Sequence, residues 1–229
     1  MNEFSSNYHP HNNDVSLHVG LIPDGGRRWA KKHNISLSES YAVSRDLIVE
    51  IAKYLFSNSV AELSIYLSSV QNFRRTESEI DSFSTVTSNG ISNEILKLAT
   101  LLNLEVRIIG DDNSLSRETI SLLADHNKKL NVETARKINL CISYNPSVEI
   151  ENAIKQREGD RSFVEYLWVK RPLDLIIRTG GANLLSNFLP LQSGFARLYF
   201  LDELFNDLSL STVEAVIEGF NNLNRKFGD

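Results

Sequence analysis

The sequence predicts an α/β fold, a single domain with a central, mostly parallel six-stranded sheet flanked by helices. Short apolar runs alternate along the chain with longer amphipathic stretches, which is typical of parallel strands joined by crossover helices. The apolar runs are nearly continuous, as expected for a sheet covered on both faces. The polar residues 1–14 predict a flexible N-terminal tail, and residues 15–229 the domain itself.

The first half of the chain is expected to alternate strand, helix, strand. Residues 15–22 are an apolar run and predict a strand. Residues 38–56 predict a helix, because apolar side chains recur at a spacing of four and Ser38 or Ser40 can cap it. Residues 63–69 contain β-branched and aromatic side chains and predict the second strand.

The second half continues the same alternation. Residues 77–102 predict helical structure with a break near residues 88–90, where Ser-Asn-Gly interrupts the pattern. The run 104–111 predicts a strand, and residues 116–131 a helix. By the same criteria the remaining elements are strands 137–145, 173–180 and 197–200, a helix from Pro146 or Ser147 to about 156, and a helix over 209–227 with Ser211 as its cap.

Composition and charge exclude several classes of protein. The chain has 229 residues with a formal net charge of −5, which argues against non-specific nucleic-acid binding. No apolar stretch is long enough to form an integral membrane segment. The single cysteine, Cys141, cannot form an internal disulfide and is expected to be a small buried hydrophobe, which fits a cytoplasmic location.

Charged and glycine-rich motifs follow the predicted strands. Asp24-Gly25-Gly26-Arg27-Arg28 follows the first strand, and Arg178-Thr179-Gly180-Gly181 follows the fifth. Ligands of parallel sheets bind beyond the C-terminal ends of the strands. Glycines let backbone N–H groups approach an anion, a helix that starts there adds its positive end, and arginines match phosphate oxygens. An aspartate among them indicates a Mg²⁺-diphosphate site.

The alternative is that Asp24 only caps a helix and that the arginines form surface ion pairs. For the first motif alone the two interpretations are about equal. The second arginine–glycine motif, at another strand end, favours a diphosphate site.

Four segments resemble the cis-prenyltransferases, the undecaprenyl diphosphate synthase family. They are "HVGLIPDGGRRWAKK", "IYLSSVQNFRRTESEI", "VRIIGD" and "LDLIIRTGGANLLSNFLPLQSGFARLYF". They occur in the family's order along almost the whole chain after the tail. The resemblance implies a parallel sheet with an apolar tunnel, and transfer of an allylic prenyl group onto isopentenyl diphosphate with Mg²⁺ as the cofactor.

The resemblance implies roles for individual residues at the first diphosphate. Asp24 matches the family's essential aspartate, which handles Mg²⁺ and the diphosphate, so it is expected to be both catalytic and metal-binding. Gly25, Gly26, Arg27 and Arg28 match the cradle of the first diphosphate, although the family usually has Asn and Gly at the positions of Gly26 and Arg27.

Other matching residues are expected around the reacting carbons and the second diphosphate. Ser69 and Asn72 match loop residues near the reacting carbons and are expected to be catalytic. Arg75 matches an arginine of a mobile loop, and Arg178 and Ser186 match binders of the second diphosphate.

The chain departs from the family pattern at several charged positions. Tyr41 replaces a usual histidine but is retained as a diphosphate-binding candidate. Leu37 and Leu184 replace arginines, and Ala182 replaces a glutamate. Arg197 stands where a metal-binding glutamate is expected, and it could bind the second diphosphate or cross to a partner subunit.

Two pairs of motifs resemble the irregular branch of the family, the lavandulyl and cyclolavandulyl diphosphate synthases. They are "PDGGRRW" with "SYA" downstream, and "SSVQN" followed by "PLQSGFARLYF". Such enzymes join two molecules of dimethylallyl diphosphate head to middle. We therefore expect a short-chain prenyltransferase of this kind that acts on dimethylallyl diphosphate or another short allylic diphosphate, and that forms a homodimer. Regular synthesis of short cis-prenyl diphosphates from isopentenyl diphosphate, prenyl transfer to a non-isoprenoid acceptor, and a non-catalytic partner subunit are the alternatives.

Overall fold

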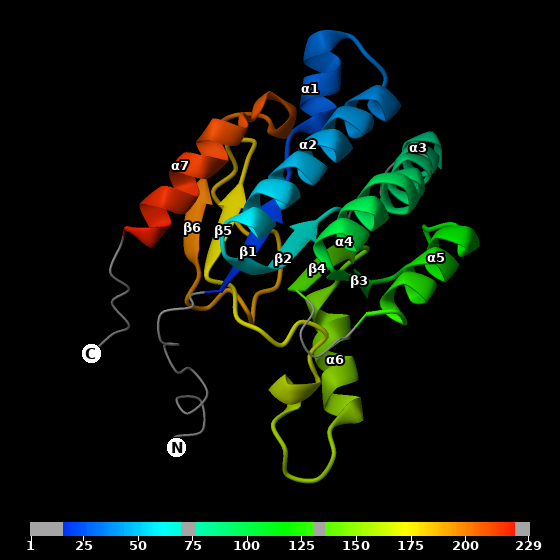
Figure 1. The fold of residues 1–229 in the computed structure, drawn as a ribbon, viewed down its shortest axis with the longest axis vertical. Coiled ribbons are helices and arrows are strands. Elements are labelled where there is room, and N and C mark those ends of the chain that lie inside the picture. Colours follow the sequence, from blue (N-terminus) through cyan, green and yellow to red (C-terminus); the bar gives the residue numbers. More distant parts are fainter. Residues whose placement is uncertain (1–15, 70–76, 131–135, 223–229) are drawn as a thin grey trace.

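Six parallel strands form the sheet that the sequence predicts, in the order β3-β4-β2-β1-β5-β6 (Figure 1). The structure is a computed structural model and describes residues 16–69, 77–130 and 136–222. The strands are β1 Leu17–Ile22, β2 Val60–Tyr66, β3 Leu104–Gly110, β4 Arg136–Ile142, β5 Leu175–Arg178 and β6 Arg197–Phe200.

Helices connect these strands. They are α1 Gly26–His33, α2 Leu37–Ser57, α3 Glu77–Gly90, α4 Leu96–Leu102, α5 Arg117–Asn127, α6 Pro146–Gln156 and α7 Leu210–Asn221. A π-helical turn η2, Ile91–Ile95, joins α3 to α4, and the 3₁₀ turns are η3 Phe163–Tyr166 and η4 Phe205–Asp207. The break expected near residues 88–90 is confirmed, because α3 ends at Gly90 and the π turn follows.

The two faces of the sheet build separate hydrophobic cores. Side chains of a strand point alternately to opposite faces, so Leu175 and Ile177 of β5 join one core and Ile176 joins the other. The larger core lies under α2, α4, α5 and α7, of which α2 crosses in front of the sheet in Figure 1. The segment 167–196 supplies much of the smaller core. Coverage on both faces explains why the strands are continuously apolar.

The predicted caps of two helices are wrong. Ser36 caps α2, not Ser38 or Ser40: its hydroxyl accepts a bond from the amide of Glu39, whose carboxylate in turn accepts from the amide of Ser36. This reciprocal capping box starts the helix earlier than the apolar spacing alone indicates. Ser209, not Ser211, caps α7 by accepting from the amide of Thr212.

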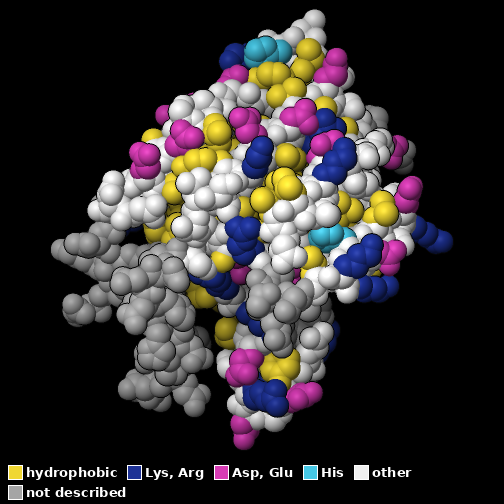
Figure 2. Space-filling view, in the orientation of Figure 1, with side chains coloured by type: hydrophobic (Ala, Val, Ile, Leu, Met, Phe, Trp, Pro, Cys, Tyr) yellow, Lys and Arg dark blue, Asp and Glu magenta, His cyan; other side chains and the backbone are white. Residues whose placement is uncertain are grey.

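Two further features concern the helices that could span a membrane and the charged side chains of the surface. Within the described parts of the chain, no helix is both long and apolar enough to cross a membrane. Figure 2 shows Lys and Arg interspersed with Asp and Glu on the visible face, without a broad basic surface. The predicted tail, residues 1–14, lies outside the described residues.

Candidate active site

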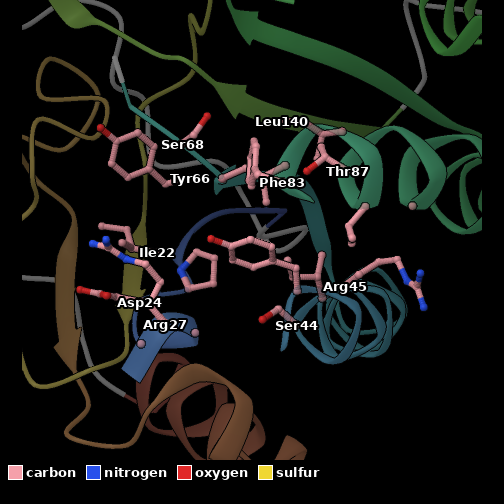
Figure 3. Close-up of a pocket in the computed structure, with 18 of the residues that line it drawn as sticks. Ile22, Asp24, Arg27, Ser44, Arg45, Tyr66, Ser68, Phe83, Thr87 and Leu140 are labelled. Atoms are coloured by element: carbon pink, nitrogen blue, oxygen red, sulfur yellow. The ribbon is translucent and has the colours of Figure 1, made fainter. Parts of the chain in front are cut away.

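A cavity of about 680 Å³ opens at the C-terminal ends of β1, β2 and β5, bounded by α1, α2 and α3. In this sheet the chain passes from β1 to β2 on one side, whereas β5 and β6 lie on the other side. Parallel sheets form their ligand crevices at such reversals of strand order. Figure 3 shows Asp24 and Arg27 on one side of the cavity, with Phe83 and Leu140 across from them.

Asp24 lies directly after β1 and pairs with two arginines. Its Oδ2 accepts a hydrogen bond of 2.9 Å from Nη2 of Arg178, and Nη2 of Arg28 lies 3.4 Å from Oδ1. The hydroxyl of Thr179 donates to the carbonyl of Asp24 at 2.8 Å and accepts from its amide at 3.0 Å. These bonds fix both the backbone and the carboxylate of Asp24, although its side chain stays 37 % exposed and therefore accessible to a ligand.

The first turn of α1 opens toward this cavity. Gly25 is the N-cap residue with φ 119°, and no side chain caps the helix. A Cβ at Gly25 would lie 3.0 Å from the Cα of Leu204, so both the positive φ and the space require glycine. The free N–H groups of the first turn carry the positive end of the helix dipole and form a site for an anion.

Arg178, at the end of β5, lies beside Asp24 and is held by further hydrogen bonds. Its side chain is 7 % exposed, and Nη1 donates to the carbonyl of Leu184 at 2.6 Å and to the hydroxyl of Ser186 at 2.8 Å. Gly180 follows with φ 85°, and a Cβ there would lie 2.5 Å from Nη2 of Arg28. Glycine at this position leaves space for the guanidinium of Arg28 between the ends of β1 and β5.

The charge of the cavity favours a polyanion. Five cationic side chains and one carboxylate are among its described lining residues: Arg27, Arg28, Lys31, Arg45, Arg178 and Asp24. The guanidinium of Arg45 lies on the side away from Asp24 in Figure 3 and pairs with Asp46 at 2.7 Å. The other four cations outnumber the single carboxylate of Asp24. The resulting net positive charge suits the negative charge of a diphosphate.

An aromatic pair separates the polar end of the cavity from its apolar side. The rings of Tyr41 on α2 and Phe83 on α3 meet edge to face, with centroids 5.9 Å apart. An atom of the Tyr41 ring lies 3.9 Å from the place of a Cβ on Gly26, close to the open turn of α1. The aliphatic lining residues are Ile22, Pro23, Ile48, Leu67, Val86, Ile91, Ile95 and Leu140.

Most of the site residues predicted from the sequence line this one cavity. They are Asp24, Gly25, Gly26, Arg27, Arg28, Tyr41, Ser69, Arg178 and Ser186. Asn72 and Arg75 lie outside the described residues.

Two strand ends do not join the site. Gly110 is the last residue of β3, the edge strand of the sheet, and is not among the cavity lining. Asn145 follows β4 and caps α6 by accepting from the amide of Ser147. Strand order, which the sequence does not specify, therefore restricts the site to the centre of the sheet.

Arg197 does not reach the cavity within one chain. It begins β6, where it pairs with Leu175, whereas Arg178 at the site end of β5 pairs with Phe200. Arg197 thus lies at the opposite end of the strand, and its side chain is exposed. A role across a subunit boundary stays a prediction.

Several lining residues lie outside the motifs that the sequence identifies. Lys31 follows Arg27 by four residues, a spacing that places both side chains on one face of a helix and could have identified it. Ser44 and Tyr66 carried no comparable signal. The expectation for Cys141 is confirmed, since it is fully buried on β4, and burial raises the pKa of its thiol well above the usual value.

The donor set fits a hard cation held partly by a substrate. The described residues contain no group of three or more His, Cys, Asp or Glu side chains that could form a metal cage by themselves. Mg²⁺ is commonly held by one or two carboxylates together with substrate phosphates. The accessible carboxylate of Asp24 beside an anion site fits that arrangement.

Comparisons with known proteins agree with this geometry. Residues 22–228 match the family described as putative undecaprenyl diphosphate synthase. An isoprenyl transferase of Treponema denticola is 30 % identical over 94 % of this chain and 99 % of its own length. A (2E,6E)-farnesyl-diphosphate-specific ditrans,polycis-undecaprenyl-diphosphate synthase of Acinetobacter baylyi is 27 % identical over 92 % of this chain and 90 % of its own.

Two solved structures share the fold. Lavandulyl diphosphate synthase from Lavandula x intermedia, solved with dimethylallyl diphosphate, has a TM-score of 0.84 at 22 % identity, covering 95 % of this chain and 100 % of that one. A probable undecaprenyl diphosphate synthase from Campylobacter jejuni has a TM-score of 0.71 at 26 % identity, covering 93 % and 99 %. These matches confirm the predicted fold class.

Proposed function

The chain belongs to the undecaprenyl diphosphate synthase family of prenyl-transferring enzymes, and from that premise we propose that it joins two molecules of dimethylallyl diphosphate head to middle. One observation carries the proposal: a cationic anion site beside Asp24 opens into a cavity that the aromatic rings of Tyr41 and Phe83 line. The diphosphate of a short allylic substrate suits the cationic site, and its prenyl group suits the aromatic rings. The structural likeness to lavandulyl diphosphate synthase is consistent with it.

The diphosphate of the ionising substrate is proposed to bind at the open turn of α1. The backbone N–H groups there and the guanidinium groups of Arg27, Arg28 and Arg178 donate to its oxygens. Charge-assisted hydrogen bonds of this kind contribute about 1.5–3 kcal/mol each. They become stronger as the allylic C1–O bond breaks, because negative charge then gathers on the diphosphate.

Mg²⁺ is the proposed cofactor. Asp24 would hold it together with substrate phosphate oxygens, and the ion would supply positive charge that makes diphosphate a better leaving group. The two guanidinium groups beside Asp24 keep its carboxylate at the edge of the anion site.

In the proposed reaction one C–O bond breaks, one C–C bond forms and one proton is lost. The C1–O bond of the first substrate breaks, and its electron pair leaves with diphosphate. The C2=C3 double bond of the second substrate attacks C1, which leaves a cation at its C3. A proton lost from a carbon beside that cation forms the new double bond, and the released diphosphate accepts it.

The irregular second substrate is proposed on the resemblance to the irregular branch, and the second diphosphate site departs from the family pattern. Leu184, where that pattern has an arginine, carries no charge and its side chain is exposed. A second diphosphate would lack that cationic partner. The rings of Tyr41 and Phe83 line the cavity on its apolar side, where a short prenyl group would pack against them.

Product analysis tests the proposal. The protein is incubated with Mg²⁺ and dimethylallyl diphosphate alone, and products are identified by mass spectrometry. We expect a ten-carbon diphosphate, and an Asp24→Asn variant that folds normally should lose at least about 100-fold in rate, because a neutral amide cannot provide the carboxylate. A product that forms only after isopentenyl diphosphate is added would refute head-to-middle coupling.

Regular elongation is the second candidate. It is supported by the relatives of this chain, whose names are isoprenyl transferase and undecaprenyl-diphosphate synthase. The same assay separates the two, because regular elongation requires both five-carbon substrates.

We also propose that the protein is a cytoplasmic homodimer. Apolar side chains are exposed near β6: Leu191, Phe195 and Leu198, of which Phe195 is 80 % exposed. A second copy of the chain is the occupant expected for such a surface. Sedimentation equilibrium checks this, and a monomer at micromolar concentration would contradict it.

A further inference from the structure

A chain of polar side chains connects the segment after β6 to the first residue of α1. Asn206 of η4 donates from Nδ2 to the carbonyl of Ser40 at 2.8 Å, and its Nδ2 lies 3.2 Å from the Ser40 hydroxyl. The hydroxyl of Ser40 donates to the carbonyl of Gly26 at 2.8 Å. Ser40 is fully buried, so these bonds are shielded from water.

Ser44 completes the network on α2. Its hydroxyl lies 2.6 Å from Oδ1 of Asn206 and 3.0 Å from the carbonyl of Ser40. Figure 3 shows this hydroxyl on the side of α2 that faces Arg27. Both polar atoms of the Asn206 amide are therefore used, one toward each serine.

The same short turn also contacts Asp24 and the far end of α1. The amide of Phe205 donates to the carbonyl of Asp24 at 3.0 Å. The carboxylate of Asp207 accepts from Nε1 of Trp29 at 2.6 Å and from Lys32 at 3.1 Å. η4 thus contacts the second half of α1 and also Asp24, the residue that precedes its cap.

We propose that Asn206, acting through Ser40, is a positioning residue that fixes the first turn of α1 against Asp24. α1 has no side-chain cap, and Gly25 and Gly26 leave its start without side chains of its own to hold it. The Ser40 hydroxyl on the Gly26 carbonyl supplies that restraint from α2. With the turn fixed, its free N–H groups keep one direction toward the cavity. This role depends on the proposed function in one respect: the anion that these N–H groups bind is taken to be a diphosphate.

Two measurements on Asn206→Ala, Ser40→Ala and the double variant test the role. The first is binding of dimethylallyl thiolodiphosphate, a non-ionising analogue, by calorimetry. Each single variant should weaken binding about tenfold, which is the cost of one buried hydrogen bond. The double variant should bind no more weakly than either single one, because both act through the Gly26 carbonyl. Asn221→Ala, an exposed asparagine at the end of α7, is the matched control and should bind as the wild type does.

The second measurement is amide hydrogen exchange in α1. Trp29 N–H donates to the carbonyl of Gly25, and its exchange should become faster in all three variants while β1 stays protected. Unchanged exchange, or multiplicative losses of binding in the double variant, would overturn the role of Asn206. If the wild type binds no diphosphate while exchange still becomes faster, the proposed function fails and the positioning role stands.

Discussion

At the scale of single residues, the site depends on groups that are distant in sequence and adjacent in space. Asp24 and Arg178 are 154 residues apart, yet their side chains form an ion pair at 2.9 Å. Each belongs to a motif that the sequence identifies by itself. Their direct contact follows only from the pairing of β1 with β5.

A second group of distant residues lies buried below the site. His18 of β1 is fully buried, with Nε2 2.8 Å from the hydroxyl of Ser64 and Nδ1 3.0 Å from the carbonyl of Arg171. The amide of Asn139 donates to that same Ser64 hydroxyl and to Glu62. Burial lowers the pKa of His18 below its usual value.

Stability should therefore fall in mild acid. The neutral form of His18 is favoured in the folded state, so its contribution is complete above the unfolded pKa of about 6.5 and is lost as the pH falls from there toward the lowered folded pKa. Urea unfolding at a series of pH values measures this. His18→Gln should remove part of the loss, whereas His33→Gln, an exposed histidine, should not; equal pH profiles for wild type and His18→Gln would contradict the assignment.

At the scale of elements, the start of α2 offers a test of local structure. Ser36→Ala removes the hydroxyl that caps α2 and should lower the free energy of unfolding by about 1 kcal/mol, measured by urea denaturation. Ser38→Ala is the matched control, because Ser38 lies within the first turn and is exposed. It should be neutral or slightly stabilising, since alanine favours helices. A larger effect at Ser38 than at Ser36 would contradict the assigned cap.

Most elements could be predicted from periodicity, and the errors have local causes. The capping box of Ser36 and Glu39 is a sequence signal that was available and outweighs the apolar spacing. The predicted strands 137–145 and 173–180 extend past the observed β4 and β5, because the residues after each strand already belong to turns. The π turn at Ile91–Ile95 has no composition signal beyond the glycine before it.

At the scale of the whole molecule, strand order decides which motifs meet. The ends of β1, β2 and β5 surround the cavity, whereas β3 lies at the edge of the sheet and takes its glycine and aspartate away from the site. The sequence predicts every strand but not this order. The hydrogen-bond network of Asn206 could not be predicted from the sequence either, because Asn206 and Ser40 are 166 residues apart and meet only in the folded chain.

The most direct test of the account is a crystal structure with dimethylallyl thiolodiphosphate and Mg²⁺ bound. The account predicts that the diphosphate lies at the first turn of α1, within hydrogen-bond distance of Arg28 and Arg178, with its prenyl group against Tyr41 and Phe83. A ligand bound elsewhere on the protein, with this cavity empty, would contradict it.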